Sequence, residues 1–213
     1  MIARSILGPC LVIGLTACYP GRSVDNNTEF ASVTTLKEKE ATFSNVKTYA
    51  LPDTVLYVPK TEDLKEVPAA TQAAILQTLR NNLNALGWTE VLNARTTPAN
   101  VYVVAAVTTE TNVYWGYVWW GYWGWYPYWP VGWGASSNWY YPGYWYPYTY
   151  STGTVMVGMV DGSAPAAEER VPLIWTAAVN GVLADASTNL AIATAGIDQA
   201  FEQSPYLGGT AVK

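Results

Sequence analysis

Residues 114–150 form a stretch of 37 residues that contains no charged side chain. The stretch holds 9 of the 11 tryptophans and 11 of the 16 tyrosines, together with 6 glycines and 4 prolines. No other part of the chain departs so far from the average composition of globular proteins. Because repeated proline and glycine interrupt regular backbone hydrogen bonding, we expect an irregular excursion that leaves a folded domain and returns to it.

Four interpretations of this aromatic segment (residues 114–150) remain open. Its rings fold back on the domain's own sheet, engage a protein partner or a second copy, stack on glycan sugars, or lie at a membrane interface. The absence of Lys and Arg argues against base stacking on single-stranded nucleic acid. The candidate interaction residues are Trp115, Tyr117, Trp119, Trp120, Trp123, Trp125, Trp129, Trp133, Trp139 and Trp145.

The N-terminus has the pattern of a secretion signal. Arg4 precedes an apolar run at residues 6–15 that is too short to span a bilayer. The sequence Leu15-Thr16-Ala17-Cys18 then resembles a bacterial lipobox, in which the cysteine is acylated and becomes the new N-terminus. We therefore predict a signal peptide at residues 1–17 and a lipidated Cys18. With Cys10 removed in the signal, no thiol remains for a disulfide or a metal site.

The predicted anchor also predicts a cellular location. Several acyl chains on Cys18 hold a protein stably at a membrane, so we expect the membrane as a partner of this residue. Residues 18–40 are predicted to be a tether that leads to the domain. Because Tyr19, rather than Asp, follows the cysteine, the outer membrane is favoured over the inner membrane of a bacterial envelope.

The residue types limit the chemistry that is available. The chain has no histidine, which excludes Ser–His, Cys–His and His–metal sites. No phosphate-binding glycine motif occurs, and a net charge of −5 without a basic cluster argues against nucleic acid. We predict a protein that is not an enzyme and holds no cofactor or metal. The best catalytic alternative is a carboxylate pair drawn from Glu110, Asp161, Glu168, Glu169 and Asp185, among which Glu110 and Asp161 end neighbouring predicted strands.

Apolar periodicity predicts an α+β domain. Two amphipathic helices are expected, and each begins after a helix-starting residue, Pro68 and Ser187. Strands are expected at 43–51, 88–92, 100–111, 152–161 and 170–182, with a further short strand at 55–58. The strand 170–182 alternates Leu173, Trp175, Ala177 and Val179 and is predicted to be half-buried. The apolar stripes of the helices are Ile75, Leu79, Leu83 and Leu86, and Leu190, Ala193, Ile197, Ala200 and Phe201.

These elements predict two layers: a mainly antiparallel sheet of about four to five strands with two helices on one face. The single domain is placed at residues 41–206, with the aromatic segment as an insertion at 114–150. Residues 207–213 are predicted to be a flexible tail.

In order and spacing, these features resemble the bacterial lipoproteins defined by domain of unknown function 4136. The similar stretches are Phe43-Ser-Asn-Val-Lys-Thr-Tyr49-Ala50, Leu86-Gly87-Trp88, Ala99-Asn100-Val101-Tyr102-Val103, the Trp-Gly-Tyr repeats, Tyr150-Ser-Thr-Gly153-Thr154-Val155, Leu173-Ile174-Trp175 and Ile197-Asp-Gln-Ala-Phe201. Leu51-Pro52 and Asn100 depart from the usual Trp and Asp, and the insertion is long. The resemblance implies a lipid-anchored envelope protein with a compact α+β domain, and it implies no catalytic residues.

Two hypotheses of function follow. The first is a non-catalytic lipid-anchored envelope protein that binds or scaffolds an envelope protein, or a second copy, through the aromatic segment. The second is a lipoprotein that binds, or less plausibly cleaves, cell-wall glycan. Retention on purified peptidoglycan distinguishes the two hypotheses.

Overall fold

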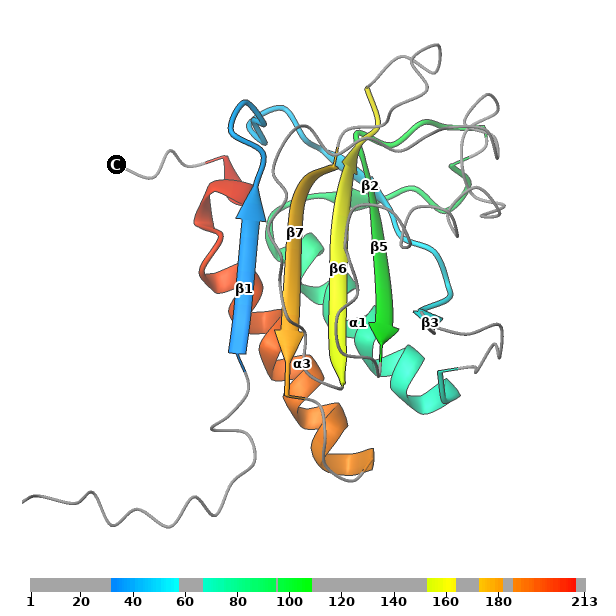
Figure 1. Cartoon of the computed structure of the whole chain (residues 1–213). Helices are drawn as coiled ribbons and strands as arrows, with labels where there is room; N and C mark the ends of the chain where they lie inside the picture. Colours follow the sequence, from blue (N-terminus) through cyan, green and yellow to red (C-terminus); the bar gives the residue numbers. More distant parts are fainter. Residues whose placement is uncertain are drawn as a thin grey trace, which may run out of the picture.

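One mixed sheet with two helices packed against it makes up the structure, a computed structural model (Figure 1). It describes residues 32–57, 67–94, 96–108, 153–163, 173–181 and 186–209. The elements within them are β1 (Ser32–Lys37), β2 (Thr48–Ala50), β3 (Leu56–Tyr57), α1 (Ala69–Ala85), β4 (Thr89–Glu90), β5 (Val101–Thr108), β6 (Thr154–Asp161), β7 (Leu173–Asn180), α3 (Ala186–Glu202) and the 3₁₀ helix η3 (Pro205–Gly208).

The described strands form a seven-stranded sheet in the order β1-β7-β6-β5-β2-β4, with β3 also paired to β5. The four long strands β1, β7, β6 and β5 are antiparallel neighbours, whereas β2, β3 and β4 make parallel pairings. The α+β class with two helices is confirmed. The predicted count of four to five strands is too low, and the sheet is mixed rather than mainly antiparallel.

The parallel side of the sheet is built from three very short strands. β2 and β3 both pair with β5, at Val101–Tyr102 and at Ala106–Val107. Pro52 lies between them and has no N–H to donate, so a single long strand is interrupted there. The chain between β2 and β3 is fixed to α1, because Gln72 Oε1 accepts a hydrogen bond from the Val55 backbone N–H at 2.9 Å.

Asn100 fixes the register at the start of β5. Its Oδ1 accepts hydrogen bonds from the backbone N–H groups of Lys47 (2.8 Å) and Thr48 (3.0 Å). In return, the Asn100 backbone N–H donates to Thr48 Oγ1 at 3.0 Å. Thr48 Oγ1 also donates to Asn100 Oδ1, at 3.1 Å. All three bonds to the side chain use an acceptor oxygen, which Asp and Asn share. The amide therefore serves at a position where the family that this chain resembles usually has a carboxylate.

β1 corrects the predicted tether. Its residues pair with β7 along its whole length, from Ser32↔Asn180 to Lys37↔Trp175, although residues 18–40 were predicted to lie outside the domain. Lysine and partial exposure are, however, ordinary for an edge strand, because they discourage pairing with other chains.

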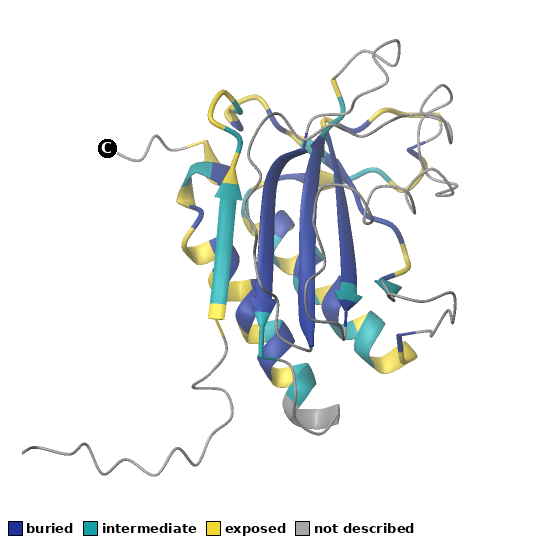
Figure 2. Ribbon diagram, in the orientation of Figure 1, coloured by how far each residue is buried: buried dark blue, intermediate teal, exposed yellow. Residues whose placement is uncertain are grey.

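The two helices cover one face of the sheet and enclose the core (Figure 2). Leu79 on α1 and Ile197 on α3 are fully buried, as their apolar stripes predicted. α1 ends at Ala85, and Gly87 follows with a φ of 81°, the left-handed conformation that glycine adopts without strain. The helices are joined where Asn82 Nδ2 donates to Asp198 Oδ1 at 2.7 Å. The prediction that Trp175 and Phe201 belong to the core is confirmed, with ring centroids 5.4 Å apart.

The chain after α3 is more ordered than predicted. A flexible tail was predicted from residue 207, but Leu207 lies within η3 and is fully buried. Trp175 Nε1 donates to the buried Ser204 Oγ at 3.1 Å, and the Tyr206 hydroxyl donates to the same oxygen at 3.2 Å. These bonds fix the start of η3 against the core. Within the described residues, neither helix is long and apolar enough to cross a membrane.

The face of the sheet opposite the helices is also buried. β7 was predicted to be half-buried, yet Thr176 and Ala178, which alternate with Trp175 and Ala177, are only 7% and 5% exposed. Figure 2 shows β5, β6 and β7 in the colour of buried residues along almost their entire length. The alternation was interpreted as one wet and one dry face, and that interpretation is wrong. We call this surface of β5, β6 and β7 the second face.

Candidate interaction site

Cys18 and the aromatic segment lie outside the described residues, and so do all ten of its candidate interaction residues. What the structure does describe is the frame that carries them. The chain enters β1 at Ser32, leaves β5 at Thr108 and re-enters the described residues at Gly153, just before β6. Ser32, Thr108 and Gly153 therefore mark where the N-terminal stretch and the aromatic segment attach to the domain.

The three points meet at one end of the sheet. Strand pairing places Thr108 opposite Thr154, Thr154 opposite Asn180, and Asn180 opposite Ser32. Three strand spacings separate the first residue of this row from the last, which is about 14 Å. In Figure 1 this is the lower end of β1, β7, β6 and β5. The N-terminal stretch and the insertion therefore attach to the same end of the domain.

Polar side chains connect this end row. Thr154 Oγ1 donates to Asn180 Oδ1 at 2.8 Å, and Asn180 Nδ2 donates to Ser32 Oγ at 3.3 Å. Thr108 and Thr154 are fully buried, although threonine hydroxyls favour water unless they are hydrogen-bonded. The side-chain bonds tie β6, β7 and β1 together where the strands end. The row is thus a rigid base for the segments that attach to it.

The re-entry to β6 has its own local signal. Gly153 has a φ of 80°, a conformation that residues with a side chain rarely adopt. This positive φ lets the chain turn sharply into the hydrogen-bonded register of β6. The sequence Gly153-Thr154-Val155 belongs to the stretches on which the family resemblance was stated, and the structure gives a backbone reason for its glycine.

Of the candidate carboxylate pair Glu110 and Asp161, the structure describes Asp161. It pairs with Val101, seven residues along β5 from Thr108, where the chain leaves the strand toward Glu110. Seven residues of strand span about 24 Å. Because β5 and β6 are antiparallel, Asp161 and Thr108 lie at opposite ends of these strands, and the expectation that Glu110 lies close to Asp161 stays a prediction. Glu110, Glu168, Glu169 and Asp185 themselves are outside the described residues.

Asp161 has a local structural role. Its Oδ1 accepts hydrogen bonds from the Ser163 backbone N–H at 2.8 Å and from Ser163 Oγ at 2.6 Å. This is the pattern of an Asx turn, in which an aspartate closes the turn that follows a strand. Among the described residues, no group of three or more His, Cys, Asp or Glu side chains lies close enough to hold a metal ion.

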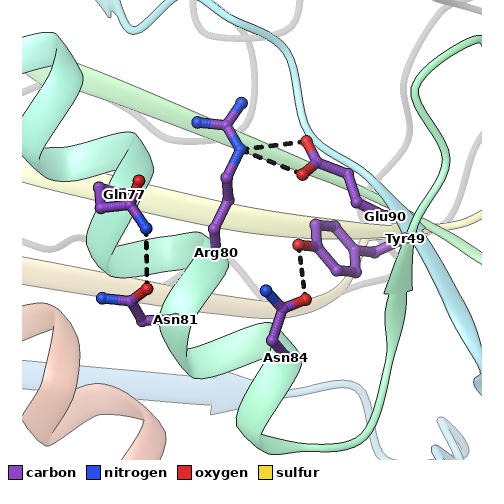
Figure 3. Close-up of polar contacts among 6 residues, drawn as sticks. All are labelled: Tyr49, Gln77, Arg80, Asn81, Asn84 and Glu90. Atoms are coloured by element: carbon purple, nitrogen blue, oxygen red, sulfur yellow. Dashed lines mark hydrogen bonds and ion pairs between the residues drawn. The ribbon is translucent and has the colours of Figure 1, made fainter.

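A polar cluster that sequence reasoning missed joins α1 to β2 and β4 (Figure 3). Arg80 Nε lies 3.1 Å from Glu90 Oε2, and both side chains are partly exposed. Beside this ion pair the buried Tyr49 hydroxyl donates to Asn84 Oδ1 at 3.0 Å. A signal was present in the sequence, because Arg80 and Asn84 are four residues apart and so share a face of a helix.

The electrostatics of this cluster do not favour catalysis. Burial, followed by the negative charge of Glu90, raises the pKa of Tyr49 to about 12. A phenol with this pKa keeps its proton at neutral pH and is a poor general base. The Arg80 guanidinium, for its part, is engaged by Glu90. The cluster therefore fastens the end of α1 to the parallel side of the sheet.

Comparison with known proteins identifies relatives of this fold. The model of a family described as a domain of unknown function, DUF4136, matches residues 33–206. A DUF4136 family protein from Bacteroides thetaiotaomicron is 28% identical with a TM-score of 0.66, over 83% of this chain and 97% of that one. No curated protein matches the chain.

Two more distant structures are also similar. PelC from Paraburkholderia phytofirmans, solved as a dodecamer, is 13% identical with a TM-score of 0.39, over 83% of this chain and 97% of that one. A PDZ domain protein from Parabacteroides distasonis is 14% identical with a TM-score of 0.43, over 86% of this chain and 37% of that one.

Proposed function

The chain belongs to the DUF4136 family, and on that basis we propose that it is a non-catalytic, lipid-anchored envelope protein that binds or scaffolds partners through its aromatic segment. The membrane is its first partner, through acyl chains on Cys18. Its second partner is an envelope protein, which includes another copy of the same chain. The outer membrane is the proposed location, since Tyr19 follows the lipidated residue.

The end row of the sheet is the observation that carries this proposal. Ser32 and the pair Thr108–Thr154 lie about 14 Å apart at one end of the domain. A coil of fourteen residues, the length of 18–31, has a mean end-to-end distance of about 20 Å. An anchor on Cys18 therefore keeps this end close to the membrane. The aromatic segment would then start from the membrane-proximal end, where other envelope proteins are concentrated.

The residue content of the segment supports binding rather than chemistry. Tryptophan and tyrosine dominate the energetics of protein interfaces because they supply a large, rigid contact area. The segment contains no charged group, and the chain contains no histidine. Asp161, the described member of the candidate carboxylate pair, is hydrogen-bonded to Ser163 within its own turn. These features leave non-covalent contact as the chemistry that the segment is suited to.

The anchor is tested with Cys18→Ser. We expect the variant to remain an unlipidated precursor that incorporates no labelled palmitate, because the thiol is the acylation site. Cys10→Ser is the matched control, and it should be processed and labelled like the natural protein. Labelling of the Cys18→Ser protein would contradict the proposal.

The interaction is tested by replacing residues 114–150 with an Asn-Gly turn in the lipidated chain. We expect the replaced protein to lose the envelope proteins, or the second copy, that crosslink to the natural protein. Leu92→Ser is the control, because Leu92 is an apolar residue that is 84% exposed and lies outside the segment. Retention of every partner by the replaced protein would refute the proposal. Binding of purified peptidoglycan by the natural protein alone would instead favour the glycan hypothesis.

A further inference from the structure

We propose that the second face of the sheet is the docking surface for part of the chain's own insertion, residues 109–152, whose aromatic rings lie across β5, β6 and β7. This inference does not depend on the proposed function, since it concerns what covers the sheet and not what the protein binds. The occupant is this named segment, and neither a second copy nor the N-terminal stretch.

The first argument is burial without a described cover. Val104, Ala106, Met156, Val160 and Ala178 are between 0% and 5% exposed. All of them point away from α1 and α3, because they alternate with residues of the core that the helices enclose. The described helices lie on the other side of the sheet, as both ribbon views show. The second face of this single chain must therefore be covered by residues outside the described ones.

The second argument is the shape of the face. Strand pairing places Ala106, Met156 and Ala178 in one row across the sheet, and Val104, Gly158 and Thr176 in the next. Small side chains flank the single long side chain of Met156, and glycine lies at the centre of the second row. Apart from Met156, the side chains of these two rows are short, and the larger Tyr102 and Leu173 lie in the row beyond them. Flat aromatic rings fit such a surface, and the methionine sulfur favours contact with them.

The third argument is polarity. Thr176 pairs with Gly158 and is 7% exposed, and its Oγ1 is a buried polar side-chain atom that has no hydrogen-bond partner. A water-filled or polar cover would pair with this hydroxyl, because buried polar groups usually find a partner. The cover at this point is therefore apolar, as the rings of an uncharged segment are.

The fourth argument is elimination among the segments outside the described residues. Residues 58–66 and 164–172 are short, and the second of these contains Glu168, Glu169 and Arg170. Residues 18–31 are polar and turn-rich, whereas residues 109–152 are long and contain the 9 tryptophans and 11 tyrosines of the aromatic segment. They also start and end on adjacent strands of this same face, at Thr108 and Gly153. Length, composition and attachment all favour this one occupant.

The area of the face sets how much of the segment it holds. Three strands of eight residues each cover about 27 by 14 Å, or roughly 400 Å². A tryptophan or tyrosine buries about 150–250 Å² in total, of which about half contacts the sheet, so about three to five rings fill the face. The segment has many more rings than that. The remaining ones are free to contact a partner, so docking and the proposed binding are compatible.

Methionine oxidation tests the docking directly. Met156 and Met159 lie three residues apart on β6, are both fully buried, and face opposite sides of the sheet. We expect replacement of residues 114–150 by an Asn-Gly turn to raise the oxidation rate of Met156 by peroxide at least about tenfold, because exposure governs this reaction. Met159, under the helices, should change less than about twofold. Protection of Met156 in the replaced protein would overturn the proposal.

A second experiment decides the case in which the replaced protein unfolds and both methionines react. It uses the full chain with Cys10→Ser and Cys18→Ser, which leaves no thiol. Thr176→Cys is combined in turn with cysteine at each candidate tryptophan, and Ala177→Cys, on the helix side of the same strand, is the matched control. We expect disulfides within one chain for Thr176→Cys with some of these positions and none for Ala177→Cys.

The outcomes separate the two proposals of this article. The absence of any intrachain disulfide to residue 176, or disulfides that form only between chains, would overturn the docking proposal. Exposure of Met156 together with retained partners would support docking and refute the proposed interaction. Loss of the partners together with a Met156 that stays protected would refute docking and support the proposed interaction.

Discussion

On β7, Trp175 and Ala177 face the two helices while Thr176 and Ala178 face the opposite side, and all four are buried. The helix side uses large side chains that interlock with α1 and α3, and Trp175 is even hydrogen-bonded to Ser204. On β7 the centre of the second face carries the small Thr176 and Ala178, although Tyr102 and Leu173 lie in another row of the same face. The helices cover their side with side chains that fit between those of the sheet. For the second face we propose flat aromatic rings as the cover. The comparison therefore sets a cover that the structure describes against one that we propose.

The largest expected effect lies on the helix side. Trp175→Ala and Leu79→Ala should each lower the free energy of unfolding by about 2–5 kcal/mol, because both side chains are fully buried and leave cavities. Denaturant unfolding measures the change, and Leu92→Ala, at an exposed position, should have almost no effect. Unchanged midpoints for both core variants would show that the helix side does not carry the stability of the domain.

Two kinds of local pattern could be used for prediction. The apolar stripe through Ile75 and Leu79 predicted α1, because a helix packed on a sheet leaves a period, and the run rich in Val and Thr at 100–111 predicted β5 as a buried strand. β1 was missed because an edge strand shares its lysine and its partial exposure with a solvated chain. The two-residue strands β3 and β4 lie within the strands predicted at 55–58 and 88–92. Their parallel pairing with β5 and β2 was not predicted, because it depends on residues distant in sequence, which no local pattern contains.

The candidate site was predictable in composition but not in position. The aromatic segment is visible from the sequence alone, whereas the row from Ser32 to Thr108 requires strand order and register. The same holds for Thr108 and Asp161, which lie at opposite ends of their strands because an antiparallel partner reverses which strand ends are neighbours. Burial of Thr176 and Ala178 could not be predicted either, because the alternation along β7 does not distinguish a sheet covered on one face from a sheet covered on both.

Each face carries a tyrosine whose pKa is raised, and we expect only the tyrosine on the second face to depend on the aromatic segment. Burial raises the pKa of Tyr49, on the helix side, to about 12, and burial raises the pKa of Tyr102, on the second face. Since the unfolded value is lower, the stability contributed by Tyr49 is complete below pH 10 and is lost between about pH 10 and 12. A shift of this size corresponds to about 2–3 kcal/mol.

Tyrosine titration by NMR checks this difference. Replacing residues 114–150 with a turn should return the pKa of Tyr102 toward its ordinary value and leave that of Tyr49 unchanged. Tyr49→Phe and Tyr102→Phe identify the two resonances, and Tyr49→Phe should lose the part of the alkaline instability that Tyr49 contributes. A Tyr102 that titrates identically with and without the segment would break the comparison.

A smaller effect tests how closely α3 packs against β7. Gly196 on α3 lies against Val179 of β7, and a Cβ at this glycine would overlap the valine side chain. Gly196→Ala should therefore destabilise the domain by about 1–3 kcal/mol. In an ordinary helix interior the same change stabilises by about 1 kcal/mol, so the sign is diagnostic.

A double-mutant cycle assigns this cost to the one contact. Val179→Ala should cost stability alone but recover much of the loss when combined with Gly196→Ala, because it removes the atoms that overlap. Thermal unfolding of the four proteins gives the coupling. If the two changes simply add, the overlap is relieved elsewhere and α3 does not pack as closely on β7 as the structure shows.

The smallest effect compares two threonines of the second face, one in its centre and one in its end row. Thr176 Oγ1 is buried and unpaired, whereas Thr154 Oγ1 donates to Asn180 Oδ1 at 2.8 Å. Replacing an unpaired buried hydroxyl by a methyl group removes a desolvation cost, so Thr176→Val should stabilise the domain by about 1 kcal/mol. Thr154→Val should destabilise it by a similar amount, because it leaves the Asn180 oxygen without its donor. Urea unfolding of the two variants resolves opposite signs even at this size. If Thr176→Val is as destabilising as Thr154→Val, a donor from the cover reaches the centre of the face, and that cover is polar where we expect it to be apolar.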